Sequence, residues 1–310
     1  MSPHSSLRIL SPAYGPLLAA IDPNLNDPLS ILDERSPQLT GALRTIIHRV
    51  LEAGASTLAT PTFGLRKLVE SDYQLFGDAL RRHSELLLEC ADPGVADFWL
   101  DFGPKSDCYR ADLAPSRAEA RDFHALQINA VDDLIYEQLL FETIPALHEA
   151  EGIALALKQA DLTGVISFVL SPEGTLLCGT PLYDAINTID RLTGNYQGLS
   201  FSMNCCSLAG AQLALQGCAQ AGNAHRLTAF YPNATETPPW EIEESCATGT
   251  EYTPPVHEDP RARVAEILYL LSQFRTSIRT IGFCCGGTVE TTREFSRQCF
   301  CLGCATMAAA

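Results

Sequence analysis

Two pairs of adjacent cysteines are the strongest candidates in this chain for reactive or metal-binding residues. Cys205 and Cys206 directly follow one apolar, strand-like run, and Cys284 and Cys285 directly follow another. Each pair runs into a turn of small residues. If both strand ends lie on one rim of a sheet or barrel, three thiolates converge on one point. Three sulfur ligands with one open position are typical of a catalytic zinc ion.

We assign the ligand roles to Cys205, Cys284 and Cys285, because Cys205 takes the strand-end position of its pair. Cys206 is expected to be a buried, unligated thiol. Neither pair has the CxxC spacing of zinc ribbons and thioredoxins. The alternative for the second pair is that both thiols are buried without a metal.

A third group of cysteines lies near the C-terminus, at Cys299, Cys301 and Cys304. These thiols could bind a soft metal by themselves, which would suit a non-enzymatic metal-binding protein. The interpretation we prefer is that they are free thiols of a tail. We therefore divide the chain into a barrel over residues 1–298 and a mobile, Cys-containing tail over residues 299–310.

The composition narrows the class of protein. The 310 residues are 46% hydrophobic and carry a formal net charge of −16 with 21 Lys and Arg, so no nucleic-acid partner is expected. No apolar run approaches the roughly 20 residues that span a bilayer, and the N-terminus lacks a signal-peptide core. We expect a cytoplasmic protein without a membrane partner. In that reducing compartment, adjacent cysteines indicate metal ligands rather than disulfides.

Strand-like segments alternate with helix-period segments along the chain. Strands are predicted at residues 7–13, 56–63, 97–103, 134–142, 164–171, 198–204, 227–233 and 278–283. Helices are predicted at residues 39–54, 66–91, 117–133, 181–194 and 259–277, with a further helix after the fourth strand. Eight such units are typical of a single-domain (β/α)8 TIM-type barrel. A doubly wound sheet is the alternative, but no GxGxxG turn follows the first strand.

Turn and cap residues support these boundaries. Gly54 is expected to end the first predicted helix as its C-cap, and Pro260 is expected in the first turn of a helix, after Asp259. Residues 231–260 form a long, Pro-rich, polar segment. In a barrel such a loop lies on the catalytic rim, where long loops are usually functional.

Polar residues mark the same ends of other predicted strands. Thr60 and Thr62 end the second strand, Glu142 ends the fourth and Asn233 ends the seventh. In a barrel, catalytic groups lie at the carboxyl ends of the strands. We therefore predict that these four residues lie on the same rim as the cysteines, with Thr60 and Thr62 as candidates for substrate binding. For Glu142 the alternative is a cap on the next helix, where a carboxylate is favourable in any case.

These motifs resemble the homocysteine S-methyltransferase family of zinc-dependent methyltransferases. The resemblance covers roughly residues 17–297. It rests on the segments 53–63, 141–150 and 230–240, on Cys205 with the asparagine before it, and on the Gly-Phe-Cys-Cys-Gly-Gly-Thr motif that contains Cys284 and Cys285. The family motif on the last strand is close to Gly-Gly-Cys-Cys-Gly-Thr, with a glycine where this chain has Phe283.

The resemblance implies that Cys205, Cys284 and Cys285 hold Zn²⁺, that Glu142 accepts a hydrogen bond from the substrate ammonium group, and that Asn233 shapes the pocket. It also implies the reaction. A methyl group would pass from S-methylmethionine or S-adenosylmethionine to the thiol of homocysteine or a related small thiol, a step of methionine biosynthesis. Coordination to zinc deprotonates a thiol, so the reaction needs no separate general base.

The sequence departs from the family at the end that binds the amino acid. Family members open with Asp-Gly-Gly after the first strand, whereas residues 11–16 of this chain are Ser-Pro-Ala-Tyr-Gly-Pro, with no acid. The Gly-Pro-Tyr-Gly turn after the third strand is also replaced. The missing acid favours an alternative, in which a divergent member binds zinc and methylates a different thiol or a selenol.

Overall fold

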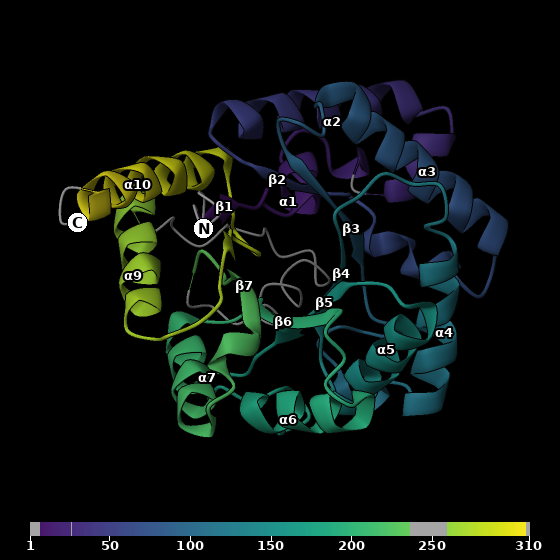
Figure 1. The fold of residues 1–310 in the computed structure, drawn as a ribbon. Coiled ribbons are helices and arrows are strands. Elements are labelled where there is room, and N and C mark those ends of the chain that lie inside the picture. The colour runs from purple at the N-terminus through teal and green to yellow at the C-terminus, as the bar shows by residue number, and fades with distance from the viewer. Residues whose placement is uncertain (1–6, 26, 236–258, 308–310) are drawn as a thin grey trace.

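The computed structural model describes residues 7–25, 27–235 and 259–307, with side chains described as far as residue 299. Eight parallel strands form one sheet in the order β1-β8-β7-β6-β5-β4-β3-β2, and helices surround it (Figure 1). The strands are β1 Arg8–Ile9, β2 Thr57–Ala59, β3 Asp97–Phe102, β4 Gln138–Ile144, β5 Gly164–Val169, β6 Leu199–Asn204, β7 Leu227–Tyr231 and β8 Thr280–Ile281. The α-helices are α1 Tyr14–Ala19, α2 Ser36–Glu52, α3 Tyr73–Cys90, α4 Arg117–Asn129, α5 Leu147–Ala160, α6 Leu182–Thr193, α7 Leu208–Ala221, α9 Pro260–Ser272 and α10 Val289–Met307.

The two ends of the sheet meet and close the barrel. Leu10 forms a parallel bridge with Thr57. On either side of this bridge, the Ser11 amide donates to the Thr57 carbonyl at 2.8 Å, and the Ser56 amide donates to the Ile9 carbonyl at 2.9 Å. The predicted (β/α)8 barrel is therefore confirmed. The doubly wound alternative is excluded, because it is an open sheet.

Side chains along each strand alternate between the barrel interior and the layer beneath the helices. On β3, Trp99 packs in the interior, whereas Phe98 and Leu100 pack under the helices. The interior cluster consists of Leu10, Trp99, Leu140, Val165, Val169, Cys205, Ala229, Tyr231 and Cys284. Two of the predicted metal ligands therefore rest on the apolar core of the barrel itself.

The structure has Pro260 where it was predicted and Gly54 one residue beyond the C-cap of α2, which is Ala53. Gly54 directly follows the C-cap of α2 with φ +100°, and a Cβ there would lie 2.2 Å from the Ser296 Oγ. Only glycine suits both the conformation and the close approach. At the other end of the chain, Pro260 is the first residue of α9, and the Asp259 side chain accepts from the Arg261 amide at 3.0 Å.

Several predicted element boundaries are wrong, and β2, predicted over residues 56–63, is confined to Thr57–Ala59. The predicted helix 66–91 divides into a 3-10 helix, η3 Phe63–Leu68, and α3. The break occurs because the Asp72 side chain caps α3 by accepting from the Leu75 amide at 3.0 Å. Strands β1 and β8 are much shorter than predicted, since the chain after β1 leaves the sheet toward Pro12 and lines a cavity.

The fourth strand is displaced from its predicted position. It begins at Gln138 and runs to Ile144, so Glu142 lies inside β4 and not at its end. The pairing of β4 with β5 shifts register between Phe141 and Ile144, and Thr143 has φ +59°. Such an irregularity re-aims side chains at the end of a strand.

The C-terminal segment is helical across the predicted tail boundary. Helix α10 includes Cys299 and continues to Met307. The side chains of Cys301 and Cys304, and residues 236–258 of the predicted rim loop, lie outside the described residues. Within the described part of the chain, every helix is too short or too polar to cross a bilayer.

One helical histidine makes the stability of the fold depend on pH. His83 of α3 is 1% exposed, and its Nε2 lies 2.9 Å from the Pro28 carbonyl oxygen, to which it donates. Burial lowers the pKa of His83 from 6.5 to about 4. The folded protein therefore keeps the ring neutral, while the unfolded chain binds a proton below pH 6.5.

We expect stability to fall as the pH drops from 6.5 toward 4. The part that is due to His83 amounts to roughly 1.5 kcal/mol between pH 6.5 and 5. The substitution His83→Gln removes this titration, so urea unfolding of the variant should depend less on pH over this interval. An unchanged pH dependence would show that the His83 ring is not held neutral in the folded protein.

Candidate metal centre

Three cysteine thiols converge at the mouth formed by the carboxyl ends of the strands. Cys205 directly follows β6, and Cys284 and Cys285 follow β8. Their Sγ atoms all lie within 4.8 Å of one another, and those of Cys205 and Cys285 are 3.6 Å apart. Cys206 instead packs in the core beneath the helices. The structure thus brings together the three thiols that were predicted as ligands, in a set that could hold a metal ion.

Main-chain hydrogen bonds help to fix the positions of the cysteines. The loop after β7 joins their two segments, because the Asn233 amide donates to the Cys206 carbonyl at 3.0 Å and the Cys284 amide donates to the Pro232 carbonyl at 3.0 Å. Cys205 has φ +46°, a left-handed conformation that is uncommon outside glycine. Strain of this kind is concentrated at functional sites.

Two of the four predicted substrate-binding residues lie behind the site. Asn233 does not line the cavity, and its Oδ1 instead accepts from the Cys285 amide at 3.3 Å. Thr62 does not line it either, and its hydroxyl donates to the Asp101 carbonyl at 2.6 Å. Thr60 does line the cavity, and its Oγ1 accepts from the Asp101 amide at 3.0 Å. The structure therefore gives Asn233 and Thr62 supporting positions, and substrate contact stays a prediction for Thr60.

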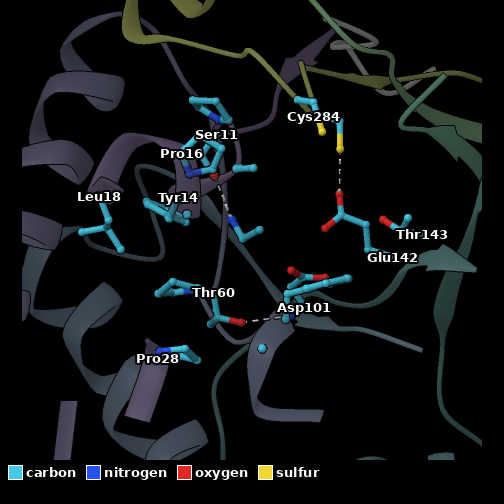
Figure 2. Close-up of a pocket in the computed structure, with 18 of the residues that line it drawn as sticks. Ser11, Tyr14, Pro16, Leu18, Pro28, Thr60, Asp101, Glu142, Thr143 and Cys284 are labelled. Carbon is cyan, nitrogen blue, oxygen red and sulfur yellow. Dashed lines mark hydrogen bonds between the residues drawn. The ribbon is translucent and has the colours of Figure 1, made fainter. Parts of the chain in front are cut away.

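Glu142 points into the barrel beside the thiols. Its Oε1 lies 3.8 Å from the Cys284 Sγ (Figure 2) and accepts from the Asn204 Nδ2 at 3.2 Å. Asn204 is held in turn by the Thr143 Oγ1 at 2.7 Å and the Ser167 Oγ at 2.8 Å. The alternative role, as a cap on α5, is excluded by this orientation. Substrate binding by Glu142 stays a prediction.

Sequence reasoning missed a second carboxyl group in the cavity. Asp101 of β3 is 6% exposed and lies near Glu142 in the close-up of the cavity (Figure 2). A signal for it exists in the sequence, because Asp101 is two residues after Trp99 in a strand whose other residues after Asp97 are apolar. Alternation places both residues on the same face, inside the barrel.

Burial and close neighbours shift the pKa of every ionisable group at this site. Burial raises the pKa of Glu142 to about 7, and burial followed by the charge of Glu142 raises the pKa of Asp101 well above its usual value. Hydrogen bonds from Cys205 and Cys284 hold the pKa of the Cys285 thiol well below its usual range. The site is therefore dry, and without a cation it accommodates little negative charge.

A cavity of about 350 Å³ extends from the thiols. Near the thiols it is bounded by Glu142, Asp101 and Tyr109, whose Oη lies 3.7 Å from the Cys205 Sγ. Its other end is mainly apolar and is lined by Tyr14, Leu18, Leu25, Pro28, Leu39, Phe63 and His83. A volume of this size suits a small molecule.

The two turns that depart from the family pattern differ in their position relative to the cavity. The turn after β1 lines the cavity with Ser11, Pro12 and Ala13 before Tyr14 begins α1, and it brings no charge. In the turn after β3, the Lys105 ammonium group pairs with Glu70, and Lys105 does not line the cavity.

The fold and this site define a (β/α)8 barrel whose mouth carries a candidate metal site of three cysteines. The family model for homocysteine S-methyltransferase matches residues 9–299. The chain therefore belongs to the homocysteine S-methyltransferase family, a family of methyltransferases.

Solved structures share the architecture. The metallated form of the homocysteine methyltransferase MmuM from Escherichia coli is similar with a TM-score of 0.71 and 20% identity, over 94% of this chain and 96% of that one. Its oxidised form gives a TM-score of 0.72 at 20% identity, over 96% and 97% of the two chains. A thermostable chitinase domain from Pyrococcus furiosus is similar in fold only, with a TM-score of 0.50 and 11% identity over 97% and 98%. No curated protein matches the chain in sequence.

Proposed function

We propose that the protein is a zinc-dependent S-methyltransferase that transfers a methyl group from a sulfonium donor to a small thiol. The observation that carries this proposal is the convergence of the Cys205, Cys284 and Cys285 thiols at the end of a small-molecule cavity. A purely structural zinc site has four protein ligands, whereas this cluster has three and opens onto a cavity. That opening favours an enzyme over a storage or regulatory metal site.

The residues present fit a zinc ion. Three soft thiol ligands favour zinc over magnesium or calcium, and burial of Cys205 and Cys284 suits a site from which water is excluded. Bound zinc would supply the Lewis acid that keeps the acceptor thiol deprotonated at neutral pH.

The other cavity residues would bind and orient the two substrates. Glu142 would accept hydrogen bonds from an ammonium group of the acceptor, and Asn204 would keep that carboxylate in place. The acceptor sulfur attacks the methyl carbon in line, the bond from that carbon to the donor sulfur breaks, and the donor leaves as a neutral thioether. Proximity within a closed cavity supplies much of the rate.

The donor in this proposal is S-methylmethionine or S-adenosylmethionine, and the acceptor is homocysteine or a related thiol, which places the reaction in methionine biosynthesis. The cytoplasm is the proposed compartment, because Cys205, Cys284 and Cys285 are free thiols and must stay reduced to bind a metal.

We expect the purified protein to hold about one zinc ion per chain and to methylate homocysteine with one of the two donors. Elemental analysis measures the metal, and mass spectrometry of the product measures methyl transfer. A fully folded but zinc-free protein, obtained from a zinc-replete preparation, would contradict the proposal.

A further inference from the structure

We propose that Asp101 and Glu142 together bind the ammonium group of the acceptor, so that the acceptors are aminothiols whose carboxylate is dispensable. This inference rests on the proposed methyl transfer and names its substrate class. It makes Asp101 a specificity residue, a role that the sequence did not predict.

Asp101 lies against the cavity and is hydrogen bonded to Glu142, but one of its two carboxyl oxygens has no partner in the described part of the chain. Asp101 is only 6% exposed, and its Oδ1 has no hydrogen-bond partner among the described residues. The backbone of Asp101 is fully engaged, with its amide donating to Thr60 and its carbonyl accepting from Thr62. A buried acceptor of this kind costs free energy unless a donor pairs with it. The missing donor would come from a ligand in the cavity.

The protein itself supplies no cation for the two carboxyl groups. No Lys or Arg lines the cavity in the part of the chain that the structure describes. Arg66 acts on Asp101 only from a distance, because its guanidinium lies 4.4 Å from the centre of the Phe63 ring and donates to the Phe63 carbonyl. The parts of the chain that the structure does not describe contain neither Lys nor Arg in their sequence; they are residues 1–6, 26, 236–258 and 308–310. The ligand must therefore bring the positive charge.

An ammonium group fits this pair of acceptors. It has three N–H donors and no acceptor, so it can donate to a carboxylate of Asp101 and to one of Glu142 at the same time. Glu142 also lies 3.8 Å from the Cys284 thiol, which places the ammonium site close to the sulfur site. A short carbon chain that joins an amine and a thiol would span the two.

The same charge distribution offers nothing to a carboxylate. A carboxylate in a buried site needs Arg, Lys or several N–H donors, whereas the side chains of Asp101 and Glu142 present two further carboxyl groups at this part of the cavity wall. The apolar lining beyond this point, which includes Leu18 and Leu39, does not offer hydrogen bonds. The carboxylate of an amino-acid thiol is expected to add little to binding.

Three thiols of similar length test the inference in the wild-type protein. Homocysteine has both charged groups, 3-aminopropane-1-thiol lacks the carboxylate and 4-mercaptobutanoate lacks the ammonium group. We expect kcat/KM for 3-aminopropane-1-thiol within about 10-fold of that for homocysteine, and a value for 4-mercaptobutanoate at least about 100-fold lower, since charged hydrogen bonds are strong. The inference is overturned if 4-mercaptobutanoate is the equal of homocysteine, or if 3-aminopropane-1-thiol falls 100-fold.

Substitution of Asp101 tests the role of this residue. In Asp101→Asn we expect the affinity for 3-aminopropane-1-thiol to fall about 10- to 100-fold, in calorimetric titrations and in KM, while zinc content is unchanged. Asp101→Ser provides a second, smaller side chain in case the first variant folds poorly. The control is Asp112→Asn, which removes an exposed carboxylate paired with Arg110 and should leave binding unchanged.

The outcomes separate this inference from the proposed methyl transfer. Normal zinc content and homocysteine methylation, with aminothiol binding that does not respond to Asp101→Asn, would overturn the inference alone. Absent zinc and absent methylation of every thiol would overturn the proposed function. In that case the calorimetric titration still decides whether Asp101 binds the amine, because it does not depend on turnover.

Discussion

Replacement of Cys284 by serine is expected to release the metal and to abolish methyl transfer. Cys284 is 6% exposed and its Sγ is one of three that lie within 4.8 Å of each other. Serine is nearly isosteric, but its hydroxyl is a hard and weakly acidic ligand that zinc does not favour. Loss of a group that only supports a ligand already costs 10–100-fold, so we expect metal affinity and kcat to fall by more than about 100-fold.

The control for this variant is Cys178→Ser. Cys178 is exposed, and its Sγ lies 3.3 Å from the Thr180 Oγ1. It does not line the cavity. Both variants lose one thiol, so general effects of thiol removal cancel. Zinc content and activity should be lost in Cys284→Ser and kept in Cys178→Ser. If Cys284→Ser kept one zinc ion per chain at unchanged affinity, Cys284 would not be a ligand.

Replacement of Gly152 by valine is expected to be strongly destabilising. Gly152 lies on α5 where this helix contacts α4. A Cβ there would lie 2.5 Å from the Ala120 Cβ, 2.6 Å from the Arg121 backbone nitrogen and 2.8 Å from the Arg117 carbonyl oxygen. Backbone atoms cannot move aside by a change of rotamer, so α4 and α5 must separate. We expect the free energy of unfolding to fall by more than about 3 kcal/mol.

The matched control is Gly41→Ala on α2. A Cβ at Gly41 would meet no atom within 4 Å, and alanine is the better helix former by about 1 kcal/mol. Urea unfolding should therefore show a stabilised Gly41→Ala protein and a strongly destabilised Gly152→Val protein. Equal stability of Gly152→Val and wild type would mean that the close approach of α4 and α5 is not present in solution.

The sequence was sufficient for the barrel and for the cluster of three cysteines because both leave local signals. Each strand is a short apolar run, and the cysteines follow two of these runs. Residues at helix ends, such as Gly54 and Asp259, act within a few residues of the ends that they define. These features depend on local chain chemistry, so the structure has them close to their predicted positions.

The cavity wall was harder to predict because it depends on contacts between distant segments. Asn233 turned out to hold Cys285, and Thr62 to hold the backbone of Asp101, through hydrogen bonds that span 52 and 39 residues. The irregularity in β4 that leaves Glu142 inside the strand arises from pairing with β5. The alternation of side chains along β3 could have predicted that Asp101 faces the interior, but Asp101 lies within the strand and not at its end.

The main-chain hydrogen bonds around the cysteines have a consequence for protein engineering. The cysteines are held by β6, β7 and β8, and the turn after β1 adjoins them because β1 pairs with β8, whereas Asp101 lies on β3 between β2 and β4. Asp101 therefore belongs to a different group of strands from the cysteines. A redesign of the accepted molecule can begin at this one side chain and leave unchanged the strands that position the sulfur atoms.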